Sequence, residues 1–250
     1  HSGDAGGIVP DSFRILRQLL DRLEDASSGR ILPAGLHAEI PLERLEQAGR
    51  ASEILGEQVF ERFPFVPGAG PAVENPTQLI LSRTWLPALA VTGAGGLPAL
   101  ADAGNVLRPA TTLRLSLRLP PTVPGEAAGA LLQELLETGA PHGARVRFRV
   151  TQATTGWHAP AQQEWLTKAL DQASQDYFGQ PAAYMGEGAS IPFMAMLGER
   201  FPTAQFVITG VLGPHANAHG PNEFLHLPAA KRLTACIAAI IARHRREMSS

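Results

Sequence analysis

The first part of the chain opens with helical patterns of apolar positions. Apolar side chains recur at spacings of three and four over residues 11–25, which predicts an amphipathic helix closed by a Ser-Ser-Gly run. A second helical pattern covers residues 41–60. The Pro/Gly-rich stretch 63–76 that follows indicates a surface loop.

The clearest strand pattern lies over residues 112–119. Leucines occupy every second position there, and Arg114, Ser116 and Arg118 lie between them. Such alternation is typical of a half-buried strand in an antiparallel sheet. We therefore expect this segment to bury its leucines, which are Leu113, Leu115, Leu117 and Leu119.

The neighbouring patterns complete most of an α+β unit. Residues 86–92 and 146–150 indicate two further strands, and residues 124–136 indicate a helix. One more strand before residue 11 would give a two-layer unit with an antiparallel four-strand sheet and two helices.

From residue 160 onward the order of elements changes. Helical patterns cover residues 162–178, 191–199 and 228–245, with a short strand expected at 182–185 and a buried strand at 205–211. Strands that alternate with helices suggest part of a layered α/β domain.

Composition narrows the classes of partner. The net charge is −2, from 21 Lys and Arg against 23 Asp and Glu, and without a basic stripe we expect no nucleic acid partner. The longest apolar helical run, residues 235–242, is far shorter than the roughly 20 residues that span a bilayer, so no membrane partner is expected.

Cys236, the single cysteine, allows neither an intrachain disulfide nor a thiolate metal cage. No signal peptide pattern opens the chain, and a cytoplasmic location is the default expectation. The chain starts with His rather than Met, which indicates a processed or truncated front.

The loop 217–223 is the strongest local candidate for chemistry. It follows the apolar run that ends at Val211, where open α/β sheets place their ligands. The neutral imidazole of His219 would make a good zinc ligand there, with Asn222 or Glu223 orienting it. A solvated loop histidine fits the same residues, because one histidine is not a metal site.

The Gly-rich turn 186–192 is the second candidate. Free backbone N–H groups before a helix make such a turn receptive to a carboxylate or phosphate, although a plain strand-to-helix turn fits equally well. A serine-hydrolase elbow is excluded, because Pro192 stands where that motif needs its second glycine.

Taken in order along the chain, four segments resemble one family, the two-zinc peptidases and amidohydrolases that include carnosinases, aminoacylases, glutamate carboxypeptidases and succinyl-diaminopimelate desuccinylase. The matching segments are His1-Ser2-Gly3 with Gly6-Gly7 and Val9-Pro10, Asn105 to Pro109 with Leu117 to Pro120, Gly186 to Pro192, and His219 to Glu223.

The resemblance implies a fold and a reaction. Members of this family have an α/β catalytic domain interrupted by an α+β lid through which the protein forms a homodimer. Residues 1–155 would be the lid, with an insertion at about 30–84, and residues 156–250 the C-terminal part of the catalytic domain. The reaction would be amide hydrolysis by a water that two zinc ions share, on a dipeptide or N-acyl amino acid substrate.

The resemblance also assigns roles to single residues. His219 would be a terminal zinc ligand, and His1 would steady the oxyanion in the partner's active site, although an N-terminal His-Ser is also left by expression tags. Arg118 would bind the substrate carboxylate through its guanidinium group. The alternative is that Arg118 is an exposed strand arginine without a ligand, like Arg114. The pocket would be lined by Glu187, Gly188 and Ser190.

The departures from the family pattern limit what this chain can do alone. No His-x-Asp and no Glu-Glu occurs in the 250 residues, and Ala189 replaces the usual second glycine of the turn. The general base and nearly all metal ligands are therefore missing, so the parent protein is expected to be an enzyme and this fragment to be inactive.

The alternative is a non-catalytic dimerisation or ligand-binding module from the same family. An unrelated α+β binding domain is disfavoured by the four ordered motifs.

Overall fold

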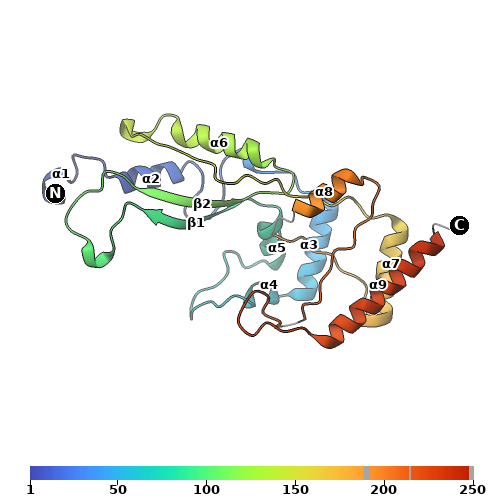
Figure 1. Ribbon diagram of the computed structural model, residues 1–250. Helices are drawn as coiled ribbons and strands as arrows, with labels where there is room; N and C mark the ends of the chain where they lie inside the picture. The colour runs from blue at the N-terminus through green and yellow to red at the C-terminus, as the bar shows by residue number, and fades with distance from the viewer. Residues whose placement is uncertain (189–191, 214, 248–250) are drawn as a thin grey trace. The chain divides into compact units, whose positions relative to one another are not determined.

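The computed structural model describes residues 1–188, 192–213 and 215–247, which divide into two compact units (Figure 1). Unit 1 comprises His1–Leu45, Gln78–Trp157 and Gly186–Phe193, and unit 2 comprises Glu46–Thr77, His158–Met185 and Met194–Ser250. The helices and strands are α1 (Ser2–Ala5), α2 (Ser12–Leu20), α3 (Leu42–Leu55), α4 (Gln58–Glu61), α5 (Pro76–Thr84), β1 (Ala88–Gly95), β2 (Thr112–Arg118), α6 (Gly125–Glu137), α7 (Glu164–Phe178), α8 (Pro192–Arg200) and α9 (Leu227–Glu247).

Unit 1 is built around one apolar core under a β-ribbon. β1 and β2 pair antiparallel, with a bulge between Val91 and Gly93. The core consists of side chains from α6 and from the segments that follow α2 and β2, namely Leu23, Ile31, Leu36, Val123, Ala128 and Leu132. Figure 1 shows α2 and α6 along the same β-ribbon.

The leucine alternation in β2 is confirmed. Leu115, Leu117 and Leu119 are half-buried against this core, and Leu113 is half-buried as well. Arg114 and Arg118, which alternate with them, are exposed. The period of two therefore identified the correct face of the strand.

The expected four-strand sheet is smaller in the structure, which shows one two-stranded sheet among the described residues. Residues 146–150 form no strand, although Val146 and Phe148 are half-buried and the arginines between them are exposed. Glu137 of α6 accepts a hydrogen bond from the N–H of Phe148 at 2.6 Å. Residues 146–150 thus keep the alternation of half-buried and exposed side chains, although no neighbouring strand pairs with them.

Unit 2 contains two long antiparallel helices, α7 and α9, that share one apolar cluster. Ala169 and Ala173 of α7 pack with Cys236 and Ile240 of α9, and Leu166 completes the cluster. The Cys236 thiol donates a hydrogen bond to the carbonyl of Ala173 at 3.3 Å. Burial raises the pKa of this thiol, so Cys236 is a packed side chain rather than a reactive one.

The prediction of two strands in the second half of the chain was wrong. Residues 182–185 and 205–211 form no strand, and Val207, Ile208 and Val211 are exposed. An apolar run of this kind becomes a buried strand only when neighbouring strands pair with it on both sides. Within the part of the chain that the structure covers, unit 2 supplies no such neighbour.

The helices agree better with the sequence. The expected helix at 11–25 is observed over Ser12–Leu20, with the Asp11 side chain accepting from the N–H of Arg14 at 3.3 Å. α5 was not expected at all. No helix in the described residues is both long and apolar enough to span a membrane.

Candidate functional site

The loop that carries His219 has an unusual backbone. His215, Asn217, His219 and Asn222 all have positive φ, between 52° and 63°. A residue with a side chain costs roughly 1–2 kcal/mol in this region, so four such residues close together are a concentration of backbone strain. Strain of this kind persists where the surrounding structure imposes it, and it often marks a functional loop.

Hydrogen bonds inside the loop hold this conformation. The Asn217 side-chain amide donates to the carbonyl of Pro221 at 2.7 Å, and the N–H of His219 donates to a Glu223 carboxylate oxygen at 3.2 Å. A Cβ at Gly220 would lie 2.5 Å from the Asn217 amide nitrogen, so any larger residue there would displace the Asn217 side chain. Glu223 therefore bonds the backbone of His219 and leaves its exposed imidazole available to a ligand.

The described residues do not form a metal centre. They contain no group of three or more His, Cys, Asp or Glu side chains placed to hold an ion. A structural or catalytic zinc takes three or four protein ligands, and two zinc ions take more. His219 can therefore be one ligand of a larger site at most, and no chemical step through a metal follows from this chain.

The Gly-rich turn lies against the last turn of α5. A Cβ at Gly188 would lie 2.7 Å from the Arg83 carbonyl oxygen, and one at Gly186 would lie 3.1 Å from Thr84 Cγ2. Arg83 Nη2 is 3.9 Å from Glu187 Oε1. Two of the expected pocket residues, Glu187 and Gly188, are thus positioned by a helix end, whereas Ser190 lies outside the described residues.

Arg83 and Thr84 were missed at the sequence level because α5 was missed. Thr84 donates its hydroxyl to the carbonyl of Ile80 at 2.7 Å inside the helix. The dipeptide Asn75-Pro76, an N-cap residue followed by proline at the first helical position, was the available signal.

His1 is placed next to a second family-like segment. Its Nδ1 accepts from the N–H of Gly3 at 3.1 Å and caps α1, while the N–H of Ser2 donates to the carbonyl of Asn105 at 2.8 Å. An open hollow of about 490 Å³ lies beside this junction. Its lining comes from both segments and from α2: Gly6, Gly7, Val9, Asp11, Phe13, Arg14, Leu97, Val106, Leu107 and Arg108.

Arg118 ends β2 with an exposed side chain. It lies opposite Ala88 in the ladder, so no bulky neighbour on β1 covers it. Within the described part of the chain, no hydrogen bond or ion pair joins Arg118, His1 and Glu187.

Tyr184 is a further polar residue that the sequence did not single out. Its hydroxyl is buried and has no hydrogen-bond partner among the described residues. Burial, followed by the nearby Asp171 carboxylate, raises its pKa, so this phenol stays protonated at neutral pH. Such a group is a donor without an acceptor.

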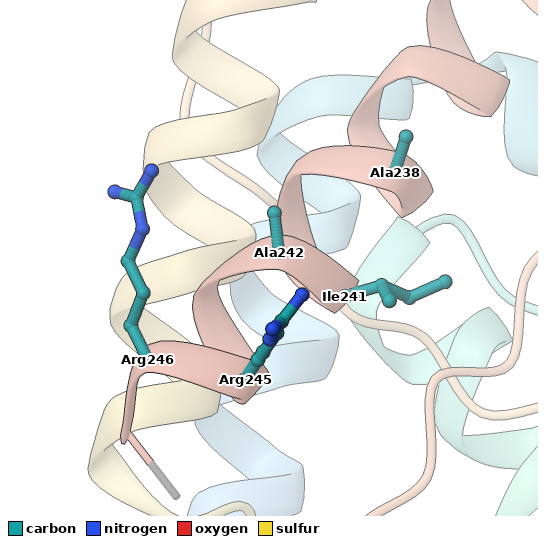
Figure 2. A pocket seen from close by; sticks show the side chains of 5 residues that line it. All are labelled: Ala238, Ile241, Ala242, Arg245 and Arg246. Atoms are coloured by element: carbon teal, nitrogen blue, oxygen red, sulfur yellow. The ribbon is translucent and has the colours of Figure 1, made fainter. Parts of the chain in front are cut away.

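A second open hollow, of about 740 Å³, lies on one helix. Figure 2 shows its lining residues along α9, with Ile241 pointing away from α7. The lining consists of Ala238, Ile241, Ala242, Arg245 and Arg246. This hollow is an uncovered helix face rather than an active-site cleft.

Sequence comparison finds similarity to a dipeptidase. The cysteinylglycine-S-conjugate dipeptidase of Corynebacterium striatum is 28% identical over 232 residues, which are 89% of this chain and 47% of that protein. The chain therefore spans about half the length of this relative.

Structure comparison finds the same fold in several peptidases, again over about half of each. The dipeptidase Dug1p of Saccharomyces cerevisiae matches with a TM-score of 0.66 and 19% identity, over 97% of this chain and 50% of that one. Human carnosine dipeptidase 1 matches with a TM-score of 0.65 and 20% identity, over 97% and 51%. The metallo-carboxypeptidase Sso-CP2 of Sulfolobus solfataricus matches with a TM-score of 0.67 and 16% identity, over 96% and 54%. At these identities the likeness shows the fold alone.

The family model agrees with the four ordered motifs. The model of peptidase family M20/M25/M40 matches residues 18–243, which is most of the chain. Members of this family are typically metal-dependent. The chain belongs to peptidase family M20/M25/M40.

Proposed function

We propose that this chain is part of a dipeptidase or related amidohydrolase. The observation that carries the proposal is family membership over residues 18–243, together with a dipeptidase as the matching relative. In this proposal residues 1–155 are an α+β lid with an insertion at about 30–84, and residues 156–250 are the C-terminal part of an α/β catalytic domain. The half-length coverage supports a longer parent protein.

The proposed substrate is a dipeptide or N-acyl amino acid with a free carboxylate. Arg118 would hold that carboxylate, because its guanidinium is exposed and offers two parallel donors. Glu187, Gly188 and Ser190 would line the pocket, and the seating of Gly188 on Arg83 supports a fixed position for this turn. His1 would stabilise the oxyanion of the partner's substrate in a homodimer formed by the lids.

The parent would bind two zinc ions, with His219 as one ligand. The exposed imidazole on a strained, internally bonded loop supports this role. When bound, the metals would polarise the amide carbonyl and supply the attacking water. The 250 residues alone are proposed to hydrolyse no dipeptide, because no paired carboxylates replace the missing general base.

The test uses the full reading frame that contains this segment. His219→Ala in the purified full-length protein should lower both zinc content and dipeptide turnover, the latter by at least about 100-fold. His215→Ala is the matched control, since His215 is an exposed histidine of the same loop with the same backbone conformation. Equal zinc content and turnover in both variants would refute the ligand role.

A non-catalytic dimerisation or ligand-binding module is the second candidate. The lack of a metal-holding group in the described residues and of His-x-Asp and Glu-Glu in the sequence favours it. The upstream reading frame separates the two: His-x-Asp and Glu-Glu motifs before residue 1 support the enzyme, and their absence supports the module.

A further inference from the structure

Five arginines of unit 1 lie in two short segments that contain no acidic residue. Residues 112–119 carry Arg114 and Arg118, and residues 144–151 carry Arg145, Arg147 and Arg149. All five side chains are exposed. The unit as a whole carries equal numbers of arginines and acidic residues, so its positive charge is concentrated here.

Packing shows that both arginine rows point away from the same core. Leu115, Leu117 and Phe148 are half-buried against that core, and the arginines alternate with them. Side chains at odd and even positions of an extended segment face opposite sides. We call the side opposite the core the arginine face.

Little covers the arginine face. The β1 residues opposite Arg118 and Ser116 are Ala88 and Ala90, both exposed and small. No ion pair of the described residues includes any of the five arginines. Arg147 lies near Glu137, whose pKa is lowered first by the N–H of Phe148 and least by Arg147.

We propose that the arginine face is a binding surface for an extended acidic peptide segment. In a fully extended segment, residues at every second position, such as Arg145, Arg147 and Arg149, repeat about every 6.6–6.8 Å, which is also the repeat of side chains along one face of an extended peptide. Each guanidinium offers a planar pair of donors that fits a carboxylate. A single-stranded nucleic acid would need aromatic stacking platforms, and the residues beside Arg118 on the β-ribbon are Ala88, Ala90 and Ser116.

The experiment measures binding of fluorescein-labelled hexaglutamate to the 250-residue chain by fluorescence anisotropy at low and moderate salt. Arg145→Glu with Arg149→Glu should weaken binding at least about tenfold, because two attractions become repulsions. Arg14→Glu with Arg17→Glu is the matched control, which makes the same change in net charge at exposed positions of α2. The control should change the affinity less than about twofold.

Three results would overturn the proposal. They are absence of hexaglutamate binding, equal weakening by the two double variants, and tighter binding of an oligothymidylate than of hexaglutamate. If the glutamate variant fails to fold by circular dichroism, Arg145→Gln with Arg149→Gln removes the charges without adding acids and should still weaken binding. The readout is binding rather than hydrolysis, and neither double variant changes Arg118 or His219. Failure of the proposed dipeptidase function therefore leaves this test intact.

Discussion

Close backbone approaches leave room for glycine alone at several positions of unit 1. A Cβ at Gly125 would lie 2.8 Å from the backbone nitrogen of Thr154, and one at Gly156 would lie 2.6 Å from Pro121 Cα. Gly129 would bring a Cβ to 3.0 Å from Val150 Cγ2. Gly125 and Gly129 let the segment after α6 lie directly on that helix, and Gly156 lets its end approach Pro121.

Gly125→Ala should therefore destabilise the protein. The added methyl group meets backbone atoms of Thr154 that cannot rotate away, and overpacking of this kind costs about 1–3 kcal/mol. Gly49→Ala in α3 is the control, because nothing lies within 4 Å of its Cβ position and alanine favours a helix interior by about 0.8–1 kcal/mol. Urea unfolding of both variants measures the difference. Equal stability of the two variants would contradict the close approach.

The turn at Asp25 provides a pH-dependent prediction. Hydrogen bonds from the side chains of Ser27 and Ser28 lower the pKa of Asp25 from 3.8 to about 2. A lowered folded-state pKa adds stability above the unfolded pKa, and this stability is lost as the pH falls through the folded value. The stability difference between wild type and Asp25→Asn should thus be constant near neutral pH and shrink between about pH 4 and 2. Urea unfolding across this range measures it, and a constant difference down to pH 2 would disagree.

At the scale of whole elements, α7 packs against α9 through one apolar cluster. Ile240 and Ile241 are sequence neighbours on α9 with opposite environments, at 7% and 64% exposure. Ile240 packs against α7, whereas Ile241 lines the uncovered hollow of Figure 2. The helix therefore has one face in the core of unit 2 and one face without a protein partner in the described residues.

Ile240→Ala and Ile241→Ala should separate these two faces. Ile240→Ala removes buried methyl groups and should lower the free energy of unfolding by about 2–5 kcal/mol. Ile241→Ala should change it by less than about 0.5 kcal/mol in the isolated chain. Urea unfolding measures both values. A large effect of Ile241→Ala would mean that this face is already covered in solution, for example by self-association.

The elements differ in how far the sequence could predict them. Helices such as α2 and α9 carry their own period of three to four, so the pattern alone located them. The prediction of a strand at 205–211 was wrong because a strand needs hydrogen-bonding partners elsewhere in the polypeptide, and the local pattern holds no information on them. The His219 loop was recognised from residue order, whereas its four positive φ values follow from hydrogen bonds within the folded loop. The close approach of Gly188 to Arg83 could not be predicted without α5, a short helix next to a loop that the apolar pattern did not indicate.

The accessible surface of the whole chain is larger than that of a compact protein of the same mass. The chain's accessible surface is 17,120 Å². A compact protein of 26.6 kDa exposes about 10,700 Å², and two separate compact domains of half that mass expose about 12,900 Å². The excess remains even when the two units are counted separately. Among the described residues, 29 large apolar side chains are exposed against 18 buried apolar residues.

This excess predicts that the purified chain is not a monodisperse monomer. The surplus of roughly 4,000 Å² is of the size that obligate interfaces bury, and large exposed apolar patches mark interfaces or aggregation sites. The chain should therefore self-associate or retain a companion polypeptide that covers this exposed surface. Light scattering combined with denaturing mass analysis of the same sample distinguishes these states, because a homodimer gives one mass and a retained companion gives two.

Ile241→Asp should lower association if the α9 face takes part, whereas Ile8→Asp, at an isoleucine exposed in unit 1, tests whether the proposed lid takes part. A single 26.6 kDa species at all concentrations, with no second peptide, would contradict both the excess-surface argument and the proposed lid dimer.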